Sequence, residues 1–213
     1  MDFADSEIVS REAAEPAMTS VKIVVAGAFG VGKTTFVGSV SEIVPLTTEG
    51  AITPASKRVD DLSGTPDKLR TTVAMDFGRV TLEAGLVLYM FGAPGQHRFW
   101  FMWDYLVHGA IGAVVLVDTR RLADSFPAVD YFEHVRLPFI VAINGFNGEF
   151  KHAVEDVQEA LRISEHVPVI KCDARQRASA TQTLMTLVEH ALALKRKRKI
   201  LAGGLASPPL VYP

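Results

Sequence analysis

The chain has 213 residues, 48% of them hydrophobic and 22% charged, which is enough apolar material for one substantial core. Its formal net charge of −2 gives no indication of a nucleic-acid partner, and its single cysteine excludes an internal disulfide framework. That residue, Cys172, stands beside an apolar run, so we interpret it as a buried structural thiol. Residues 1–20 lack the basic start and apolar centre of a signal peptide, and no apolar run is long enough to span a membrane. We therefore expect a cytoplasmic protein.

The order of the elements predicts the fold. Residues 1–20 have the composition of a disordered lead-in and residues 200–213 that of a flexible tail, which leaves one domain over residues 21–199. Apolar runs predict six strands, and the patterns between them predict helices. The strands are expected at 22–26, 73–82, 86–91, 113–117, 139–143 and 167–171, and the helices at 33–42, 98–107, 122–135, 153–163 and 177–199.

Runs such as 113–117 are apolar at every position, which requires helices on both faces of a parallel sheet. The pattern over residues 79–90 predicts a hairpin, which brings in one antiparallel edge strand. We therefore predict a three-layer α/β fold with a mostly parallel six-stranded sheet and one antiparallel edge strand. In such sheets ligands bind at the carboxyl ends of the strands, so the loops that follow the strands are the candidate site.

A phosphate-binding motif links the first strand to the first helix. Gly27, Gly32, Lys33 and Thr34 satisfy the P-loop pattern G-x-x-x-x-G-K-[ST] in a strand-turn-helix context. Backbone N–H groups of such a loop turn toward phosphate oxygens, and the helix directs the positive end of its dipole at the same anion. We expect Lys33 to reach the β- and γ-phosphates, Thr34 to bind Mg²⁺ and Thr35 to contact the α-phosphate. The predicted nucleotide-binding residues of this loop are Phe29, Gly30, Val31, Gly32, Lys33, Thr34 and Thr35.

A long polar segment follows the first helix and ends at Thr71 and Thr72. Loops of this length inside a compact domain are usually functional or disordered. Residues 72–77 read Thr-Val-Ala-Met-Asp-Phe, and here the chain resembles the Ras-like small GTPases, in particular the Rab branch. In that family the corresponding threonine completes the Mg²⁺ shell when the γ-phosphate is present. The resemblance makes Thr72 a metal ligand beside Thr34.

The loop after the third strand resembles the D-x-x-G-Q motif of the same family. Gly95 and Gln96 match the motif, whereas Gly92 replaces the aspartate and removes one carboxylate from the outer metal shell. The resemblance implies Gln96, Lys33 and Gly95 as catalytic residues, with Gln96 orienting the attacking water. A loop glutamine without a role is the alternative. The aromatic residues that follow fit either a core or a partner-binding face. They are Phe99, Trp100, Phe101, Trp103 and Tyr105.

The loops after the last two strands correspond to the base-reading loops of the family. Asn144 and Asn147 stand at the ends of the N-K-x-D motif, with Gly145 in place of the lysine. An asparagine at position 147 has one acceptor oxygen where the family aspartate accepts from two guanine donors, so the choice between guanine and adenine stays open. The turn Asp173, Ala174 and Arg175 matches the S-A-K turn. The resemblance implies a bond from the Ala174 N–H to the base and an arginine on the ring face.

One residue of the phosphate loop bears on catalysis. Phe29 occupies a position beside the γ-phosphate that is commonly glycine or aspartate in the family, so it narrows the route for an arginine supplied by a partner. We expect slow intrinsic hydrolysis. More narrowly, the chain resembles the small GTP-binding proteins of actinobacterial conservons, which are similar to the bacterial Mgl-type GTPases. This resemblance implies a Roadblock/LC7-domain regulator and a sensor-kinase-like membrane protein as partners.

Several readings compete with a GTP-hydrolysing switch. One is a pseudo-GTPase scaffold that binds nucleotide and partners without switching, and another is an ATP-using P-loop protein. Residues 76–78 spell the Asp-Phe-Gly of protein kinases, but no kinase catalytic loop precedes them. The basic run Lys195, Arg196, Lys197, Arg198 and Lys199 either complements the helix dipole or attaches the chain weakly to an anionic membrane surface.

Overall fold

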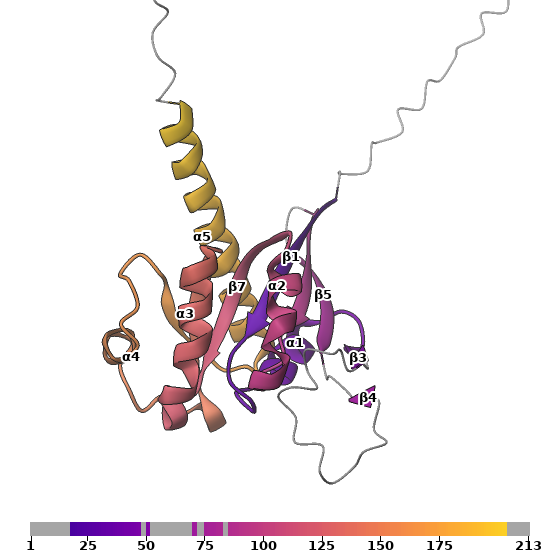
Figure 1. The fold of residues 1–213 in the computed structure, drawn as a ribbon, viewed down its shortest axis with the longest axis vertical. Helices are drawn as coiled ribbons and strands as arrows, with labels where there is room; N and C mark the ends of the chain where they lie inside the picture. Colours follow the sequence, from indigo (N-terminus) through magenta and orange to yellow (C-terminus); the bar gives the residue numbers. More distant parts are fainter. Residues whose placement is uncertain (1–17, 48–49, 52–69, 72–74, 83–84, 204–213) are drawn as a thin grey trace, which may run out of the picture.

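The computed structural model of the protein describes residues 18–47, 50–51, 70–71, 75–82 and 85–203 (Figure 1). Most of the expected lead-in, the long polar segment, Thr72 and the tail from residue 204 lie outside the described residues. In the described part of the chain, no helix is both long and apolar enough to cross a membrane.

The sheet has the strand order β2-β5-β6-β1-β7-β8-β9. Its six longer strands are β5 (Asp76–Leu82), β6 (Leu86–Gly92), β1 (Thr19–Ala26), β7 (Ala110–Val117), β8 (Phe139–Asn144) and β9 (Val169–Cys172). From β6 to β9 all neighbours are parallel, whereas β5 pairs antiparallel with β6. This confirms the predicted α/β fold. The antiparallel strand is not quite at the edge, because the two-residue β2 (Leu46–Thr47) pairs with its outer side. A separate two-stranded ribbon joins β3 (Gly50–Ala51) to β4 (Arg70–Thr71).

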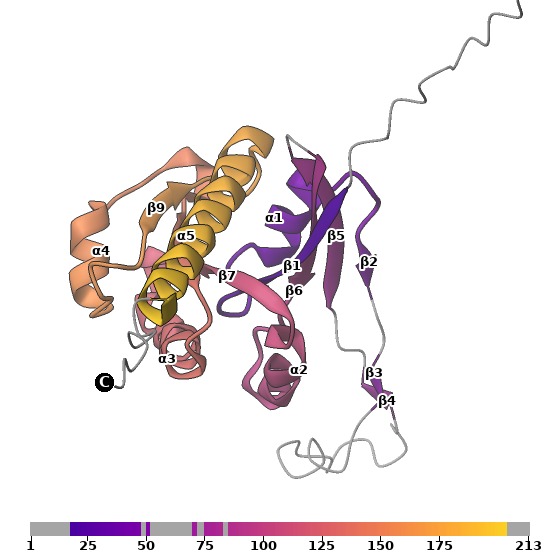
Figure 2. The same cartoon turned by 90° about the horizontal axis from the view of Figure 1, so that it is seen from above.

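Helices cover both faces of this sheet (Figure 2). On one face lie α1 (Lys33–Val40) and α5 (Arg177–Gly203), and on the other lie α2 (Trp103–Val107), α3 (Phe126–Val135) and α4 (Val154–Ala160). Short 3-10 helices precede α2 at His97–Met102, α3 at Thr119–Ser125 and α4 at Phe146–Gly148. The helix expected over residues 153–163 ends earlier, because Arg162 adopts a left-handed backbone with φ of 54°.

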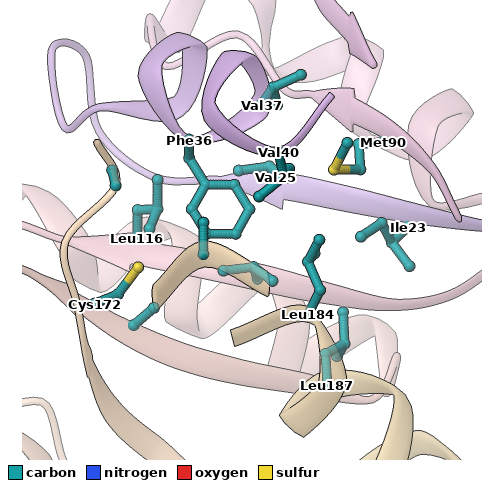
Figure 3. Close-up of a cluster of buried hydrophobic side chains, with 14 of the residues drawn as sticks. Ile23, Val25, Phe36, Val37, Val40, Met90, Leu116, Cys172, Leu184 and Leu187 are labelled. Atoms are coloured by element: carbon teal, nitrogen blue, oxygen red, sulfur yellow. The ribbon is translucent and has the colours of Figure 1, made fainter. Parts of the chain in front are cut away.

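Each face of the sheet has its own apolar core. Phe36, Val37 and Val40 of α1 belong to one buried cluster with Leu184 and Leu187 of α5 (Figure 3). Cys172 is fully buried in this cluster, and burial raises the pKa of its thiol, which fits a structural role.

The apolar core on the other face of the sheet buries part of the aromatic run over residues 99–105. Trp103 is 2% exposed, stacks on Phe132 and donates its indole N–H to the carbonyl of Pro94 at 3.0 Å. Phe99 is also buried, whereas Tyr105 is 78% exposed. Core packing therefore accounts for Phe99 and Trp103, and only Tyr105 of this run presents a large exposed side chain.

Candidate functional site

The phosphate loop lies between the carboxyl end of β1 and the first turn of α1. Its glycines Gly27, Gly30 and Gly32 have φ of 136°, 74° and 107°, which side-chain-bearing residues rarely adopt. Val31 is buried inside the loop, whereas Phe29 projects with 65% of its surface exposed. The expected strand, turn and helix are therefore all present, with the Gly32 backbone in the left-handed region at the N-cap of α1.

The side chain of Lys33 folds back over this loop. Its ammonium donates to the carbonyls of Gly27 at 3.0 Å and Ala28 at 2.8 Å. Burial lowers the pKa of Lys33 to about 8, and the negative charge of Asp76 opposes part of that shift. Thr34 and Thr35 follow on the exposed first turn of α1.

The carboxylate of Asp76 lies beside Gly92, the position where the family motif has an aspartate. The Thr34 hydroxyl donates to Oδ2 of Asp76 at 2.7 Å, and Asp76 is only 7% exposed. Because β5 and β6 are antiparallel, with Phe77 opposite Phe91, the preceding residue Asp76 comes next to Gly92. A Cβ added to Gly92 would lie 3.0 Å from both Cβ and Oδ2 of Asp76. Asp76 therefore brings a carboxylate from the neighbouring strand to the end of β6.

The donor set at this point suits a hard divalent cation. Thr34 and Asp76 present a hydroxyl and a carboxylate, which are the oxygen ligands that Mg²⁺ takes, usually together with substrate phosphates and water. Among the described residues there is no cluster of three or more His, Cys, Asp or Glu side chains that would enclose a metal. The arrangement thus fits an ion that is held jointly by the protein and a phosphate rather than by a protein cage.

Gly95 and Gln96 lie next to the phosphate loop. A Cβ on Gly95 would approach Lys33 Nζ and the Phe29 backbone nitrogen to 2.7 Å, so only glycine fits this approach. Gln96 is half-buried, and its Oε1 accepts from Arg98 Nε at 2.9 Å. Both residues line a cavity of about 360 Å³ together with Phe29 and Arg121. The structure therefore brings Lys33, Gly95 and Gln96 together beside the phosphate loop.

Asn144 ties the base-reading loops to the phosphate loop. Its Nδ2 donates to the carbonyl of Val31 at 2.9 Å, and its Oδ1 accepts from the backbone N–H of Ala174 at 3.1 Å. Asn144 is 7% exposed and Ala174 1% exposed. The N–H that we expect to contact a base is therefore already bonded to Asn144.

A guanidinium joins Asn147 to Asp173. Arg175 donates to Asp173 through Nε at 3.1 Å and Nη2 at 3.0 Å, and its Nη1 lies 3.4 Å from Oδ1 of Asn147. These bonds lower the pKa of Asp173. Asn147 itself is exposed and has a left-handed backbone, with φ of 59°. The three predicted residues are thus close together, with the amide oxygen of Asn147 turned toward a cation.

The space that a lysine would take at Gly145 is filled. A Cβ on Gly145 would lie 2.5 Å from Cζ of Phe150. Nearby, the Arg120 guanidinium lies 3.6 Å over the ring of Phe146, and it bonds both oxygens of the buried Asp118 at 2.9 and 2.8 Å. Arg120 and Phe146 line a second cavity of about 190 Å³ between the loops after β7 and β8, to which Asn144 and Asn147 also contribute.

Sequence reasoning missed several of these residues, among them Asp76, Phe150 and Arg121. Asp76 carries a usable signal, because extending the predicted hairpin by three pairs beyond Arg79 and Tyr89 puts it opposite Gly92. Phe150 and Arg121 carry none, since neither belongs to a motif and only the folded chain brings them to Gly145 and Phe29.

The sheet order and the loop at its centre define a P-loop nucleotide-binding domain with the fold of a G domain. The chain belongs to the family described as conserved hypothetical ATP-binding proteins, whose model matches residues 25–194.

Other proteins are similar to this chain in sequence or in fold. An uncharacterized protein of Methanocaldococcus jannaschii is 27% identical over 126 residues, which cover 58% of this chain and 69% of that protein. The G domain of the T. maritima FeoB iron transporter is 18% identical with a TM-score of 0.56, over 81% of this chain and 99% of that one. The cytosolic domain of the same transporter in a GDP form gives a TM-score of 0.60 at 18% identity, over 82% and 64% of the two chains.

Proposed function

We propose that this chain is a nucleotide-dependent switch, which binds GTP and GDP with Mg²⁺ and hydrolyses GTP slowly. The observation that carries the proposal is the bond between Thr34 and Asp76 beside Gly92. Without it, the glycine at position 92 would argue for a degenerate site. With it, the phosphate loop still has a carboxylate within reach of its threonine.

The proposed metal would be held by Thr34 and Asp76, with Thr72 as a further ligand in the triphosphate state. When bound, Mg²⁺ neutralises charge on the β- and γ-phosphates. The chain's own residues have separate roles. Lys33 binds the same phosphates, the Gly95 N–H faces the γ-phosphate, and Gln96 orients the water. Because Gln96 is bonded to Arg98, that bond must open for Gln96 to act.

Guanine is the proposed base, and adenine is the second candidate. The FeoB structure in its GDP form has the same fold, which supports a guanine nucleotide here. The family description names ATP instead, and the amide at Asn147 lacks the second acceptor that guanine would use. A contact between Arg175 and a bound base would help either purine, since a guanidinium stacks on any aromatic ring.

Partners are proposed from the conservon resemblance alone. They are a Roadblock/LC7-domain regulator and a sensor-kinase-like membrane protein, which would select one nucleotide state. The basic residues 195–199 lie near the carboxyl end of α5, which projects beyond the sheet (Figure 1), and they are exposed. They would add a weak attraction to an anionic membrane surface. The alternative is a scaffold that binds nucleotide without switching.

The test is equilibrium binding of labelled GDP, ADP and XDP to the purified chain, with Mg²⁺ and with EDTA. Tighter binding of GDP in Mg²⁺ supports the proposal, and a preference for ADP moves the chain to the ATP-using class. Single-turnover hydrolysis then separates switch from scaffold, because Gln96→Leu should lose turnover while it keeps its affinity for GDP. Unchanged turnover in Gln96→Leu would remove this residue from the mechanism.

A further inference from the structure

Arg121 reaches the phosphate loop from the segment that follows β7, the strand paired with β1. It lies in the 3-10 helix that follows β7, and its Nη2 donates to the carbonyl of Phe29 at 2.9 Å, across 92 positions of sequence. Its own backbone leaves the helical region, with φ of −141° and ψ of 54°, so the helix is kinked at this residue. The kink separates Arg121 from Arg120, which turns to Phe146 instead.

Within the described residues, Arg121 forms two long ion pairs with carboxylates, and one of these carboxylates is shared with Arg120. Asp118 is 2% exposed, and both of its oxygens are bonded to Arg120 at 2.9 and 2.8 Å. Arg121 approaches Asp118 and Asp124 only to 3.8 Å each, and about half of its side chain is exposed. Neither ion pair is short enough to fix the guanidinium, so it keeps hydrogen-bonding capacity for another anion.

The surroundings indicate which anion that would be. Arg121 lines the cavity of about 360 Å³ that also contains Phe29, Gly95 and Gln96. Gly95 in turn packs against Lys33 Nζ and the Phe29 backbone nitrogen. The guanidinium therefore shares one cavity with the glutamine expected to orient water, and it is held on the third residue of the phosphate loop.

We propose that Arg121 is a catalytic cation, supplied by the chain itself, that binds the γ-phosphoryl group during hydrolysis. The inference rests on the proposed function. In the reaction, a water oxygen forms a bond to the γ-phosphorus while the bond from that phosphorus to the bridging oxygen of GDP breaks. The water's proton leaves to a phosphate oxygen or to solvent, and Arg121 keeps its own. Its role is to stabilise negative charge on the transferring group.

This role accounts for Phe29. A phenyl ring that is 65% exposed and lines the cavity would obstruct an arginine from a partner, whereas Arg121 lines the same cavity and is bonded to the Phe29 carbonyl. Hydrolysis would still be slow in absolute terms. G domains that carry their arginine in cis turn over at about 10⁻² s⁻¹, against roughly 5–20 s⁻¹ for Ras with its activating partner.

The experiment compares the full chain with Arg121→Ala, Arg121→Lys and the control Arg136→Gly. Arg136 lies at the carboxyl end of α3, whereas Arg121 lies in the 3-10 helix that precedes α3. Because the φ of Arg136 is 55°, a glycine suits its backbone, and the substitution removes the same charge. Two quantities are measured for each variant: the single-turnover rate with bound GTP, and the dissociation constant for GDP. Assembly of a complex with GDP and aluminium fluoride, which mimics the transferring phosphoryl group, provides a readout besides turnover.

We expect Arg121→Ala to lower the rate by about 100-fold or more and to abolish the aluminium fluoride complex, with GDP affinity within about threefold of the native chain. Arg121→Lys should recover part of the rate, and Arg136→Gly all of it. A native rate in Arg121→Ala would overturn the inference. So would a parallel loss of GDP affinity, which would mean that Arg121 only anchors the phosphate loop. If the native chain binds but does not hydrolyse GTP, or binds no nucleotide, the proposed function fails first and this inference with it.

Discussion

The carboxylate of Asp76 packs against the backbone of Gly92, and a Cβ at position 92 would come within 3.0 Å of its Oδ2. Two adjacent antiparallel strands thus offer room for one carboxylate beside Thr34, and β5 rather than β6 supplies it. The glycine at position 92 is then a steric requirement of Asp76 as well as a departure from the D-x-x-G-Q pattern. This relationship leads to two predictions about the metal.

Asp76→Asn should remove most of the Mg²⁺ dependence of nucleotide binding. In an outer-shell arrangement the carboxylate accepts a hydrogen bond from a metal-bound water. Such a bond to a charged group contributes about 1.5–3 kcal/mol, so the ratio of GDP affinities in Mg²⁺ and in EDTA should fall by roughly 10-fold to 100-fold. The affinity in EDTA should change little. Asp130→Asn, on the exposed face of α3, removes the same charge away from the site and serves as the control. An Mg²⁺ effect that survives in Asp76→Asn would show that the metal is held without this carboxylate.

Moving the carboxylate between the strands should restore the site. Gly92→Asp alone places a second carboxylate against Asp76, and overpacking of this kind costs about 1–3 kcal/mol of stability. The double variant Asp76→Gly with Gly92→Asp removes both the Cβ and the carboxylate that crowd position 92, and it returns one carboxylate to the end of β6. We expect it to regain both the unfolding midpoint in urea and the Mg²⁺ effect. If the losses of stability and of the Mg²⁺ effect in the double variant equal the sum of those in the single variants, the two positions are not equivalent.

Nucleotide affinity should fall with rising pH through the titration of Lys33. Burial lowers the pKa of this ammonium to about 8 in the free protein, and a bound phosphate favours the charged form. Below that pH the lysine is already charged, whereas above it each binding event must take up a proton, which weakens binding. The dissociation constant for GDP should therefore rise between about pH 7.5 and 9. Lys33→Arg carries a guanidinium that stays charged, so this added slope should be absent from it. Equal slopes in the two proteins would contradict the assignment.

Asn147→Asp should shift the base preference toward guanine. A carboxylate accepts from both guanine donors that face the family aspartate, and each charged hydrogen bond adds on the order of 1.5–3 kcal/mol. Arg175 Nη1 lies 3.4 Å from Asn147 Oδ1 and would pair with the new charge, which reduces the gain. We expect GDP affinity to rise by about tenfold, with ADP affinity unchanged. A constant ratio of GDP to ADP affinity would mean that position 147 does not face the base.

The fold could be predicted from the sequence because its strands are apolar at consecutive positions and its phosphate motif is local. Val114 and Ile140 are buried in runs that admit only a covered sheet. The ends of the elements were harder to predict. The helix α4 stops before Arg162, which has a left-handed backbone, and no glycine or proline at that position signals the end. The same difference separates the site residues. Lys33 and Thr34 can be predicted from a local sequence motif. The contacts of Asp76 with Thr34 and of Arg121 with Phe29 join residues 42 and 92 positions apart, so they depend on the folded structure.

The ring of Phe150 lies 2.5 Å from where a Cβ on Gly145 would begin. A lysine at position 145 therefore requires the Phe150 ring to move, and a small residue at position 150 would leave a void beside Gly145 unless a side chain at 145 filled it. Each change alone therefore carries a cost that the other offsets, so we expect the two positions to be coupled in evolution. Among homologous chains we expect them to covary: a lysine at the first position should accompany a small residue at the second, and a glycine should accompany an aromatic ring.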